Sequence, residues 1–280
     1  MSAVLMDGNA LSAKIKEEVA AAVSQMAKRP TLAVILVGDD PASAIYVRNK
    51  EKDCDRCGIE CRDYRPDPAV TQSRLLELVE QLNRDPSVDG ILVQLPLPRG
   101  LDADSILCAI DPDKDVDCFH PFNAGRLWQG GNVYQPCTPA GVMALLREYR
   151  IDPAGKQCVI IGRSNIVGKP MAALLLQAHG TVTVCHSKTE DLSELCRKAD
   201  ILVAAAGQKG LVTADMVKPG AVVIDVAMNH RADGKLCGDT DFDAVSEIAS
   251  FITPVPGGVG PMTRAMLMVN TLTAAQRHQK

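Results

Sequence analysis

Aromatic residues are scarce in this sequence: one Trp, four Tyr and four Phe make up 3% of its 280 residues. Proteins that hold single-stranded nucleic acid stack the bases on aromatic side chains, so this composition disfavours such a surface. Positive charge is not in excess either, because 30 Lys and Arg face 34 Asp and Glu, for a net charge of −4. Without a basic surface to neutralise phosphates, the sequence predicts no nucleic-acid partner.

Long apolar segments are also missing. No stretch approaches the roughly 18 consecutive apolar residues of a membrane span, so no membrane partner is predicted. The first residues, MSAVLMDGNALSAKIKEEV, lack the charged start and long apolar core of a signal peptide. We therefore expect a cytoplasmic protein.

Ten cysteines are scattered along the chain, and free thiols are the default in a reducing compartment. The motif CDRC, with Cys54 and Cys57, is followed by Cys61 and is compatible with a metal or redox pair. No second close pair follows, and no nearby histidine completes a zinc ligand set. The sequence therefore favours structural or incidental thiols, and no metal site is predicted.

The first half of the chain alternates between strand and helix patterns. The apolar runs TLAVILVG (31–38) and VDGILVQL (88–95) are typical of buried parallel strands, and IECRDYR (59–65) predicts a shorter strand. TQSRLLELVEQLNRD (71–85) has the spacing of an amphipathic helix. Strands that alternate with helices predict βαβ units and a mostly parallel sheet.

A second series of the same kind begins after residue 150. Strands are predicted at 156–162, 181–187, 200–207 and 220–227, with helices at 167–180 and 191–199. The Gly- and Pro-rich segment 122–141 is interpreted as the connection between two domains, a number that also fits the chain length. The last segment, 263–279, predicts a helix that packs back on the first domain. The predicted domains are therefore 1–139 plus 258–280, and 140–257.

The segment VIIGRSNIVGKP (159–170) predicts a strand, a glycine turn and a helix. Such a turn lets backbone N–H groups approach a phosphate, but the spacing from Gly162 to Gly168 is not the usual G-x-G-x-x-G. Spacing alone leaves a dinucleotide site and an ordinary strand–helix turn both open.

The end of the next strand bears on the kind of dinucleotide. An NAD enzyme usually has a carboxylate there for the ribose 2′-hydroxyl, whereas this chain has CHSKT (185–189). Arg163, Ser164, Ser187 and Lys188 are suited to a 2′-phosphate, which favours NADP over NAD. Taken alone, Arg163 is equally consistent with a solvated surface charge.

Two further segments stand out. In PVPGGVGPMTRAM (254–266), three glycines permit close backbone approach and Thr263 is placed to help cap the following helix; a ligand loop and a hinge both fit. In AIYVRNKEKDC (44–54), Tyr46 and Lys50 are four residues apart and share one face of the expected helix.

Seven motifs in order carry a family resemblance: YVRNK (46–50), GILVQLPLP (90–98), DPDKDVDCFHP (111–121), NAGRL (123–127), CTPAG (137–141), GRSNIVGKP (162–170) and PGGVGPMT (256–263). With them the chain resembles the bifunctional methylenetetrahydrofolate dehydrogenase/cyclohydrolase family. The resemblance implies oxidation of 5,10-methylenetetrahydrofolate by NADP+, then hydrolysis of 5,10-methenyltetrahydrofolate to 10-formyltetrahydrofolate.

The resemblance also implies a fold and an assembly. Two α/β domains would flank a cleft, usually in a homodimer. The second domain would be a Rossmann-type NADP-binding module. The first would carry the folate chemistry and be closed by the C-terminal helix.

The family motifs imply site residues as well. Lys50 would be the catalytic lysine, Tyr46 would lie against the folate, and Gln94 would hold and tune the lysine. A desolvated cleft and a cationic substrate would lower the pKa of such a lysine and let it handle a proton. Asp117 would accept from the donor edge of the pterin, with Asp113 and Asp115 as competitors in the same acidic run.

The remaining implied contacts fall into two sets. Substrate binding is expected at Tyr46, Lys50, Val93, Gln94, Leu95, Asp117, Pro256, Gly257 and Gly258. Cofactor binding is expected at Gly162, Arg163, Ser164, Val167, Gly168, His186, Ser187 and Met228.

Two departures from the family pattern are visible. Cys118 stands where the family often has Gly, and DVAMN (225–229) replaces DVGIN, which puts Ala227 and Met228 beside the expected cofactor. Neither removes a group that the chemistry needs. A monofunctional dehydrogenase is disfavoured because Lys50 and Gln94 are retained. A non-catalytic NADP sensor would leave YVRNK, VQLPLP and DVD without a purpose.

Overall fold

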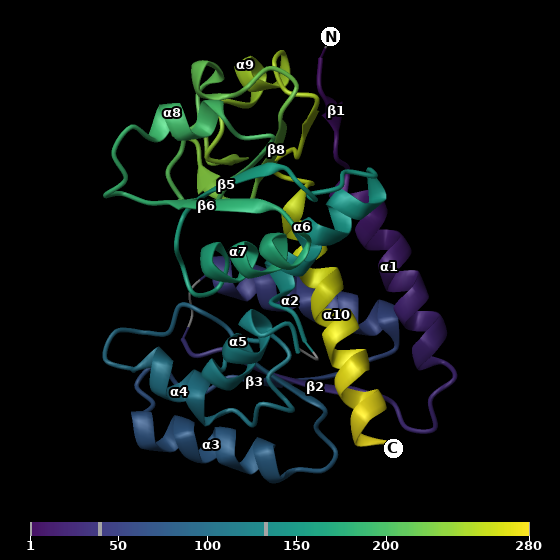
Figure 1. Ribbon diagram of the computed structural model, residues 1–280. Coiled ribbons are helices and arrows are strands. Elements are labelled where there is room, and N and C mark those ends of the chain that lie inside the picture. The colour runs from purple at the N-terminus through teal and green to yellow at the C-terminus, as the bar shows by residue number, and fades with distance from the viewer. Residues whose placement is uncertain (1, 39–40, 132–133, 280) are drawn as a thin grey trace. The chain divides into compact units, whose positions relative to one another are not determined.

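The computed structural model describes residues 2–38, 41–131 and 134–279. The chain forms two compact units. Unit 1 contains Met1–Ser12 and Pro136–Thr263, and unit 2 contains Ala13–Gln135 and Arg264–Lys280. Both are α/β units, as the sequence predicts (Figure 1).

Unit 2 is built on a three-stranded parallel sheet. Its strands are β3 (Glu60–Tyr64), β2 (Thr31–Ile35) and β4 (Gly90–Val93), in the order β3-β2-β4. Every residue of β2 and β4 is buried, which is why these strands read as continuous apolar runs. The two runs predicted as strands are confirmed.

Helices of unit 2 cover this sheet. They are α2 (Pro41–Cys57), α3 (Gln72–Arg84), α4 (Ala103–Ala109) and α5 (Pro121–Trp128), together with most of α1 (Gly8–Val23) and α10 (Val259–His278). In α3 the buried residues are Leu75, Val79 and Leu82, the stripe that the amphipathic pattern predicts. They join side chains of β2, β4 and α4 in one apolar core.

The C-terminal helix α10 belongs to unit 2 from Arg264 onward, which confirms the prediction that it packs back on the first domain. Asn270 of α10 is buried, and its amide donates to the carbonyls of Val116 (2.8 Å) and Gln135 (2.9 Å). Thr263 lies inside this helix and not at its cap. Its hydroxyl donates to the carbonyl of Val259 one turn earlier, so the capping prediction is wrong.

The segment 122–141 is not simply a connection. It contains most of α5 and the start of α6 (Cys137–Glu148), while residues 132 and 133 lie outside the described residues. Pro121 occupies the first turn of α5, where its missing N–H costs nothing, and His120 caps the helix by accepting from the N–H of Phe122. Gly and Pro therefore mark helix ends here.

Unit 1 contains a six-stranded sheet in the order β1-β11-β8-β7-β5-β6, and every neighbouring pair is parallel. The strands are β1 (Val4–Leu5), β5 (Gln157–Ile161), β6 (Thr181–Cys185), β7 (Ile201–Ala204), β8 (Val222–Asp225) and β11 (Phe251–Ile252). From β5 the chain forms β6 on one side and then returns to form β7 on the other. This reversal is the topological switch point of a doubly wound fold.

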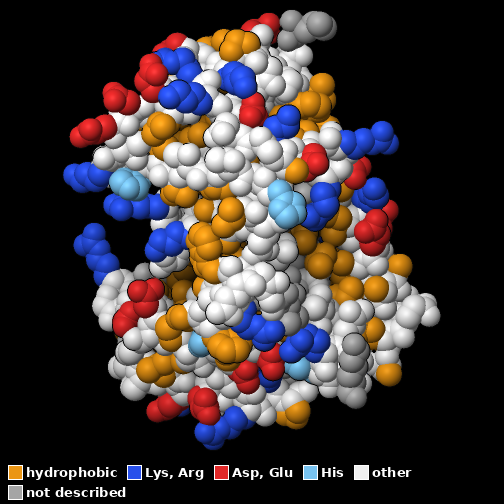
Figure 2. Space-filling view, in the orientation of Figure 1, with side chains coloured by type: hydrophobic (Ala, Val, Ile, Leu, Met, Phe, Trp, Pro, Cys, Tyr) orange, Lys and Arg blue, Asp and Glu red, His pale blue; other side chains and the backbone are white. Residues whose placement is uncertain are grey.

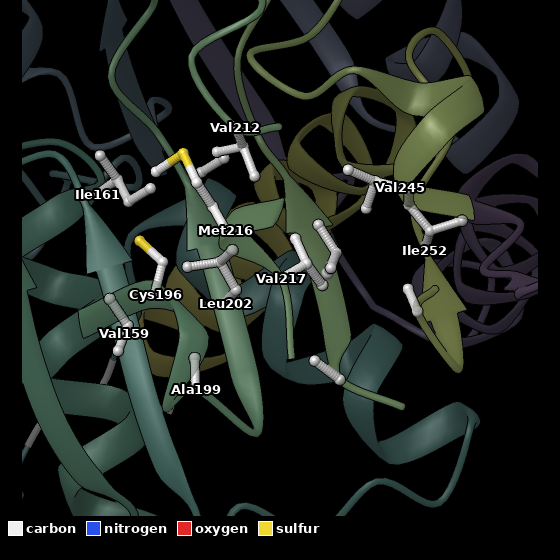
Figure 3. Close-up of a cluster of buried hydrophobic side chains, with 14 of the residues drawn as sticks. Val159, Ile161, Cys196, Ala199, Leu202, Val212, Met216, Val217, Val245 and Ile252 are labelled. Atoms are coloured by element: carbon white, nitrogen blue, oxygen red, sulfur yellow. The ribbon is translucent and has the colours of Figure 1, made fainter. Parts of the chain in front are cut away.

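Helices lie on both faces of this sheet. On one face, α8 (Leu192–Arg197), the 3-10 helix η1 (Ala214–Met216) and α9 (Phe242–Ser246) bury an apolar cluster that includes Val159, Leu202, Cys196 and Val245 (Figure 3). On the other face lie α6 and α7 (Gly168–Gln177) (Figure 1). A short antiparallel hairpin, β9 (Asn229–His230) and β10 (Leu236–Cys237), follows β8. The predicted Rossmann-type architecture is confirmed.

The first residues of the chain lie in unit 1, whereas the sequence groups them with the first predicted domain. The reason is β1, whose Val4 and Leu5 pair in parallel with Phe251 and Ile252 at the edge of the unit 1 sheet. The boundaries near residues 139 and 258 also differ by a few residues from those of the compact units. Which ligand each predicted range binds stays a prediction.

Two features of the structure bear on possible membrane and nucleic-acid partners. Across the described residues, no helix combines the length and the apolar character that crossing a membrane requires. On the face shown in Figure 2, acidic and basic side chains both occur on each unit.

Candidate functional site

One candidate site in unit 2 is centred on the amine of Lys50. Lys50 and Tyr46 are both half-buried on α2, one helical turn apart. The Nζ atom of Lys50 donates to Oε1 of Gln94 at 3.0 Å. The structure thus brings together two predicted residues that are 44 positions apart in the chain.

Gln94 is held in place by the sheet. It follows β4 directly, and its backbone N–H donates to the carbonyl of Ile35 at 2.9 Å. Its amide nitrogen donates to the carbonyl of Leu95 at 2.7 Å, so the amide oxygen is the atom presented to Lys50. A lysine on a flexible stem is therefore anchored by a group with a fixed orientation.

Tyr46 keeps its proton at neutral pH. Burial raises the pKa of its phenol above the ordinary value, and the nearby positive charge of Arg264 opposes that rise. The phenol is therefore a neutral donor and acceptor with an apolar ring, which suits a residue that lies against a flat heterocycle.

The aspartates of the acidic run 111–117 differ in burial and in their partners. Asp115 is buried, and its carboxylate accepts from the backbone N–H groups of Phe119 (3.1 Å) and His120 (2.8 Å) and from the Asn123 amide (2.9 Å). Burial raises its pKa, which these hydrogen bonds partly offset. Asp113 is exposed and pairs with Arg277 at 3.1 Å. Both carboxylates therefore have structural partners within the unit.

Asp117 is half-buried, two residues beyond Asp115. Asp115 forms a parallel bridge with Ile91 of β4, so the chain runs beside β4 in the same direction. This direction places Asp117 toward the carboxyl end of β4, the end from which Gln94 projects. Val93, at that end of β4, has its side chain in the apolar core, while Leu95 is half-buried.

The second candidate site is a pocket of about 300 Å³ in unit 1. It lies where β5, β6 and β7 end, which is the switch point of the sheet and the usual ligand position of this fold. Its lining residues are Ile161, Gly162, Arg163, Ser164, His186, Ser187, Leu192, Ala205, Ala206, Gln208 and Leu211. Five of the predicted cofactor residues are among them: Gly162, Arg163, Ser164, His186 and Ser187.

The glycines of the β5–α7 turn are required by close packing. Gly162 has a φ of +132°, and a Cβ atom on it would lie 2.3 Å from the carbonyl oxygen of Ala205. A Cβ atom on Gly168 would lie 2.1 Å from the carbonyl oxygen of Gly162. The Ser164 hydroxyl accepts from the N–H groups of Val167 (3.2 Å) and Gly168 (3.3 Å), which shapes the start of α7. Such a turn leaves room for a phosphate beside the backbone.

Three predicted cofactor residues do not line this pocket within the described part of the chain. Val167 and Gly168 shape the turn beneath it, and Met228 is 42% exposed after β8. Sequence reasoning missed Ile161, Leu192 and, after β7, Ala205, Ala206, Gln208 and Leu211. Apolar residues carry no chemical signal, but the rule that ligands bind where neighbouring parallel strands end points to the segment after β7.

The loop with Pro256, Gly257 and Gly258 has its own packing reason for glycine. The Gly257 carbonyl accepts from the N–H groups of Gly8 (2.9 Å) and Asn9 (3.2 Å), at the start of α1. A Cβ atom on Gly258 would lie 2.7 Å from both the carbonyl oxygen of Pro254 and Cβ of Thr253. Tight packing alone accounts for these glycines, so a ligand role for this loop stays a prediction.

The cysteine motif near α2 shows no ligand set. Cys54, Cys57 and Cys61 are not joined by disulfides, and burial raises the pKa of the Cys57 thiol to about 11. Residues 2–38, 41–131 and 134–279 contain no group of three or more His, Cys, Asp or Glu arranged to hold a metal ion.

A doubly wound sheet with a glycine turn and a pocket at its switch point defines a dinucleotide-binding protein of the Rossmann class. Two family models match the chain, "Tetrahydrofolate dehydrogenase/cyclohydrolase, NAD(P)-binding domain" over residues 136–279 and the catalytic domain of the same name over residues 6–117. The chain belongs to the tetrahydrofolate dehydrogenase/cyclohydrolase family.

Relatives match over the full length. The bifunctional protein FolD of Acetivibrio thermocellus is 54% identical over 283 aligned residues, which cover 100% of this chain and 99% of the relative. That of Burkholderia thailandensis is 56% identical and covers 99% of this chain and 98% of the relative.

Solved structures agree with this fold. The bifunctional FolD of Campylobacter jejuni has a TM-score of 0.96 and 53% identity, covering 99% of this chain and 100% of the other. The Trypanosoma brucei FolD, solved with NADP cofactor and an inhibitor, has a TM-score of 0.95 and 40% identity, covering 100% of this chain and 99% of the other.

Proposed function

We propose that this chain is a bifunctional one-carbon folate enzyme. It oxidises 5,10-methylenetetrahydrofolate to 5,10-methenyltetrahydrofolate with NADP+ and hydrolyses that product to 10-formyltetrahydrofolate. Membership of the family supports both activities. The observation that carries the hydrolytic half is the 3.0 Å contact between Lys50 and Gln94, because a dehydrogenase alone needs no such pair.

In the hydrolytic step, water adds to the amidinium-like carbon of the methenyl group. A proton leaves the added water to give a neutral carbinol. As the bond from that carbon to N5 then breaks, N5 gains a proton and the hydroxyl proton is lost, so that the formyl group stays on N10 and one proton is released overall. Lys50 is proposed to accept the proton of the water and to return it to N5, since a positioned general base must lie within hydrogen-bond reach of the proton that it takes. Gln94 fixes the amine and takes no proton, and Tyr46 lies against the pterin.

Asp117 is proposed to accept from the N–H groups of the pterin edge. The match of the DVD motif (115–117) to the family pattern supports Asp117 over Asp113 and Asp115 for this role. Val93, Leu95, Pro256, Gly257 and Gly258 stay predicted substrate contacts.

The unit 1 pocket is proposed to hold NADP. When bound, this cofactor accepts the hydride, a step that needs alignment and no protein acid or base. The turn with Gly162 and Gly168 suits the pyrophosphate, and Arg163, Ser164 and Ser187 suit the 2′-phosphate. Val167, His186 and Met228 complete the proposed set.

Homodimer assembly and a cytoplasmic location, which the family resemblance implies, stay predictions.

Replacing Lys50 by Met tests the proposal, because Met keeps the bulk of the side chain and cannot carry a proton. We expect Lys50→Met to open directly supplied methenyltetrahydrofolate no faster than buffer does, measured by loss of its absorbance. Lys52→Met, an exposed lysine two residues along α2, should keep wild-type hydrolysis. Wild-type hydrolysis by Lys50→Met would contradict the assignment.

A further inference from the structure

Asp53 is a buried carboxylate on α2 that pairs with two cations. Its Oδ1 atom accepts from Nζ of Lys16 on α1 at 2.6 Å, and its Oδ2 atom accepts from Nη1 of Arg264 on α10 at 2.7 Å. The side chains of Asp53 and Lys16 are only 10% and 5% exposed. All three residues lie in unit 2.

Stability alone is a weak explanation for this cluster. Removing charges from water costs free energy that the attraction between them only partly returns, so a buried ion pair is often no more stable than apolar side chains of the same volume. Such a cluster does fix the relative positions of the helices that carry it, because one carboxylate must accept hydrogen bonds from donors in two directions. Here the two donors come from two different helices.

The position of Asp53 links the cluster to the candidate site. Asp53 follows Lys50 by three residues and Tyr46 by seven, so all three share one face of α2. The same Nη1 atom of Arg264 also donates to the carbonyl of Asn49, the residue before Lys50, at 3.4 Å. Arg264 therefore contacts α2 on both sides of Lys50 along the chain.

We infer that Arg264, with Asp53 and Lys16, is a positioning residue that fixes the rotation of α2 and thereby places the Lys50 amine on Gln94. This inference rests on the proposed function of Lys50. Gln94 is fixed by the sheet, whereas Lys50 depends on the orientation of its helix and on a long side chain. A small rotation of α2 moves the end of that side chain most. A displacement of about 1 Å in a catalytic group can cost up to about 100-fold in rate.

The two proposed activities of this protein provide the readout. Hydrolysis uses the Lys50 amine, whereas hydride transfer needs no protein acid or base. In Arg264→Met we expect kcat for hydrolysis of methenyltetrahydrofolate to fall by about 10-fold, while kcat for NADP-dependent oxidation changes by less than about 2-fold. A purely structural role would lower both activities together.

A matched control is available on the same helix. Arg56 of α2 pairs with Glu17 of α1 at 3.0 Å, but both side chains are exposed, at 47% and 72%. Exposed pairs contribute little, so Arg56→Met should leave both rates unchanged. Arg264→Lys keeps the charge and should recover most of the lost hydrolysis.

The outcomes are distinct. Equal loss of both activities in folded Arg264→Met, or no loss of hydrolysis, would overturn the inference. If Arg264→Met does not fold, Lys16→Met decides in the same assay, because it removes the other donor to Asp53. Lys50→Met, measured in the same assay, separates the two hypotheses. If Lys50→Met retains hydrolysis, the proposed function is refuted. If Lys50→Met loses hydrolysis while Arg264→Met hydrolyses at the wild-type rate, only the positioning role is refuted.

Discussion

Arg163 is exposed and lines the unit 1 pocket, after the strand that carries the glycine turn. The sequence left it open whether this arginine reads a 2′-phosphate or is a solvated surface charge. Its position in the pocket, together with Ser164 and Ser187, favours the first. A charge-assisted contact to the 2′-phosphate would act on NADP+ and not on NAD+, which lacks the 2′-phosphate.

Arg163→Ala should therefore weaken NADP+ and spare NAD+. We expect the Kd for NADP+ to rise by about 10-fold, which corresponds to a loss of about 1.4 kcal/mol in binding free energy. The Kd for NAD+ should change by less than about 2-fold. Titration with each cofactor measures both constants. Arg147→Ala, an exposed arginine of α6, serves as the control. Equal losses for the two cofactors would show that Arg163 does not recognise the 2′-phosphate.

Cys118 shows how a departure from the family pattern is accommodated. Its φ is +61°, in the left-handed region where the family's usual Gly has no steric cost. The side chain is buried, and its thiol donates to the carbonyl of Tyr134 at 3.5 Å. Burial and this weak hydrogen bond offset part of the backbone strain.

Individual site residues were predictable from the sequence only where they carry reactive groups. The helical spacing of Tyr46 and Lys50 is a local signal, but the contact with Gln94 joins distant parts of the chain, and the family resemblance supplied that pairing. The cluster of Lys16, Asp53 and Arg264 had no such signal. Each of these residues looks like an ordinary surface charge in the sequence, and only the packing of α1, α2 and α10 brings them together.

At the scale of elements, a buried carboxylate joins the segments behind the unit 1 pocket. Asp239 accepts from the N–H groups of Ala206 (2.7 Å) and Gly207 (3.0 Å) after β7 and from the Asn229 amide (2.9 Å) in β9. Ala206 lines the pocket. Asp239 itself is fully buried, so its three donors have no ready substitute in water.

Asp239→Ala should loosen this wall of the pocket. We expect a loss of about 2–3 kcal/mol in the free energy of unfolding, because buried donors lose their acceptor. Weaker NADP+ binding should accompany it. Urea unfolding and cofactor titration measure the two effects. Asp241→Ala is the control, since Asp241 is exposed and its side chain makes no capping hydrogen bond to α9. Unchanged NADP+ affinity in a destabilised Asp239→Ala would show that the loop after β7 does not contact the cofactor.

Elements were predictable where a continuous apolar run marks a strand. The buried strands β2, β4, β5, β7 and β8 are apolar runs and were all found. β1 was missed because it has two residues, 51% and 52% exposed, and exists only through its pairing with β11. In the same way, α5 was missed because its flanking Pro and Gly residues resemble a linker.

At the scale of the whole molecule, the chain returns to each unit after leaving it. Unit 1 takes the first residues and unit 2 takes the last, so neither unit is one continuous segment. The sequence predicted the return of the C-terminal helix to the first domain. It gave no such signal for the N-terminus, where a two-residue strand decides the membership.

The division into two units predicts which segments bound NADP+ should protect from hydrogen exchange. A ligand that binds only the folded state stabilises it by about 2.7 kcal/mol at 100 times its Kd, and its contacts slow amide exchange locally. We expect saturating NADP+ to slow hydrogen exchange in the segments after β5, β6 and β7, residues 162–168, 186–187 and 205–211, measured by mass spectrometry. NAD+ at the same concentration should protect them less. Because each of these segments contributes residues to one pocket in unit 1, protection that appeared first in α2 and β4 would place the nucleotide in unit 2 and refute the assignment of the pocket.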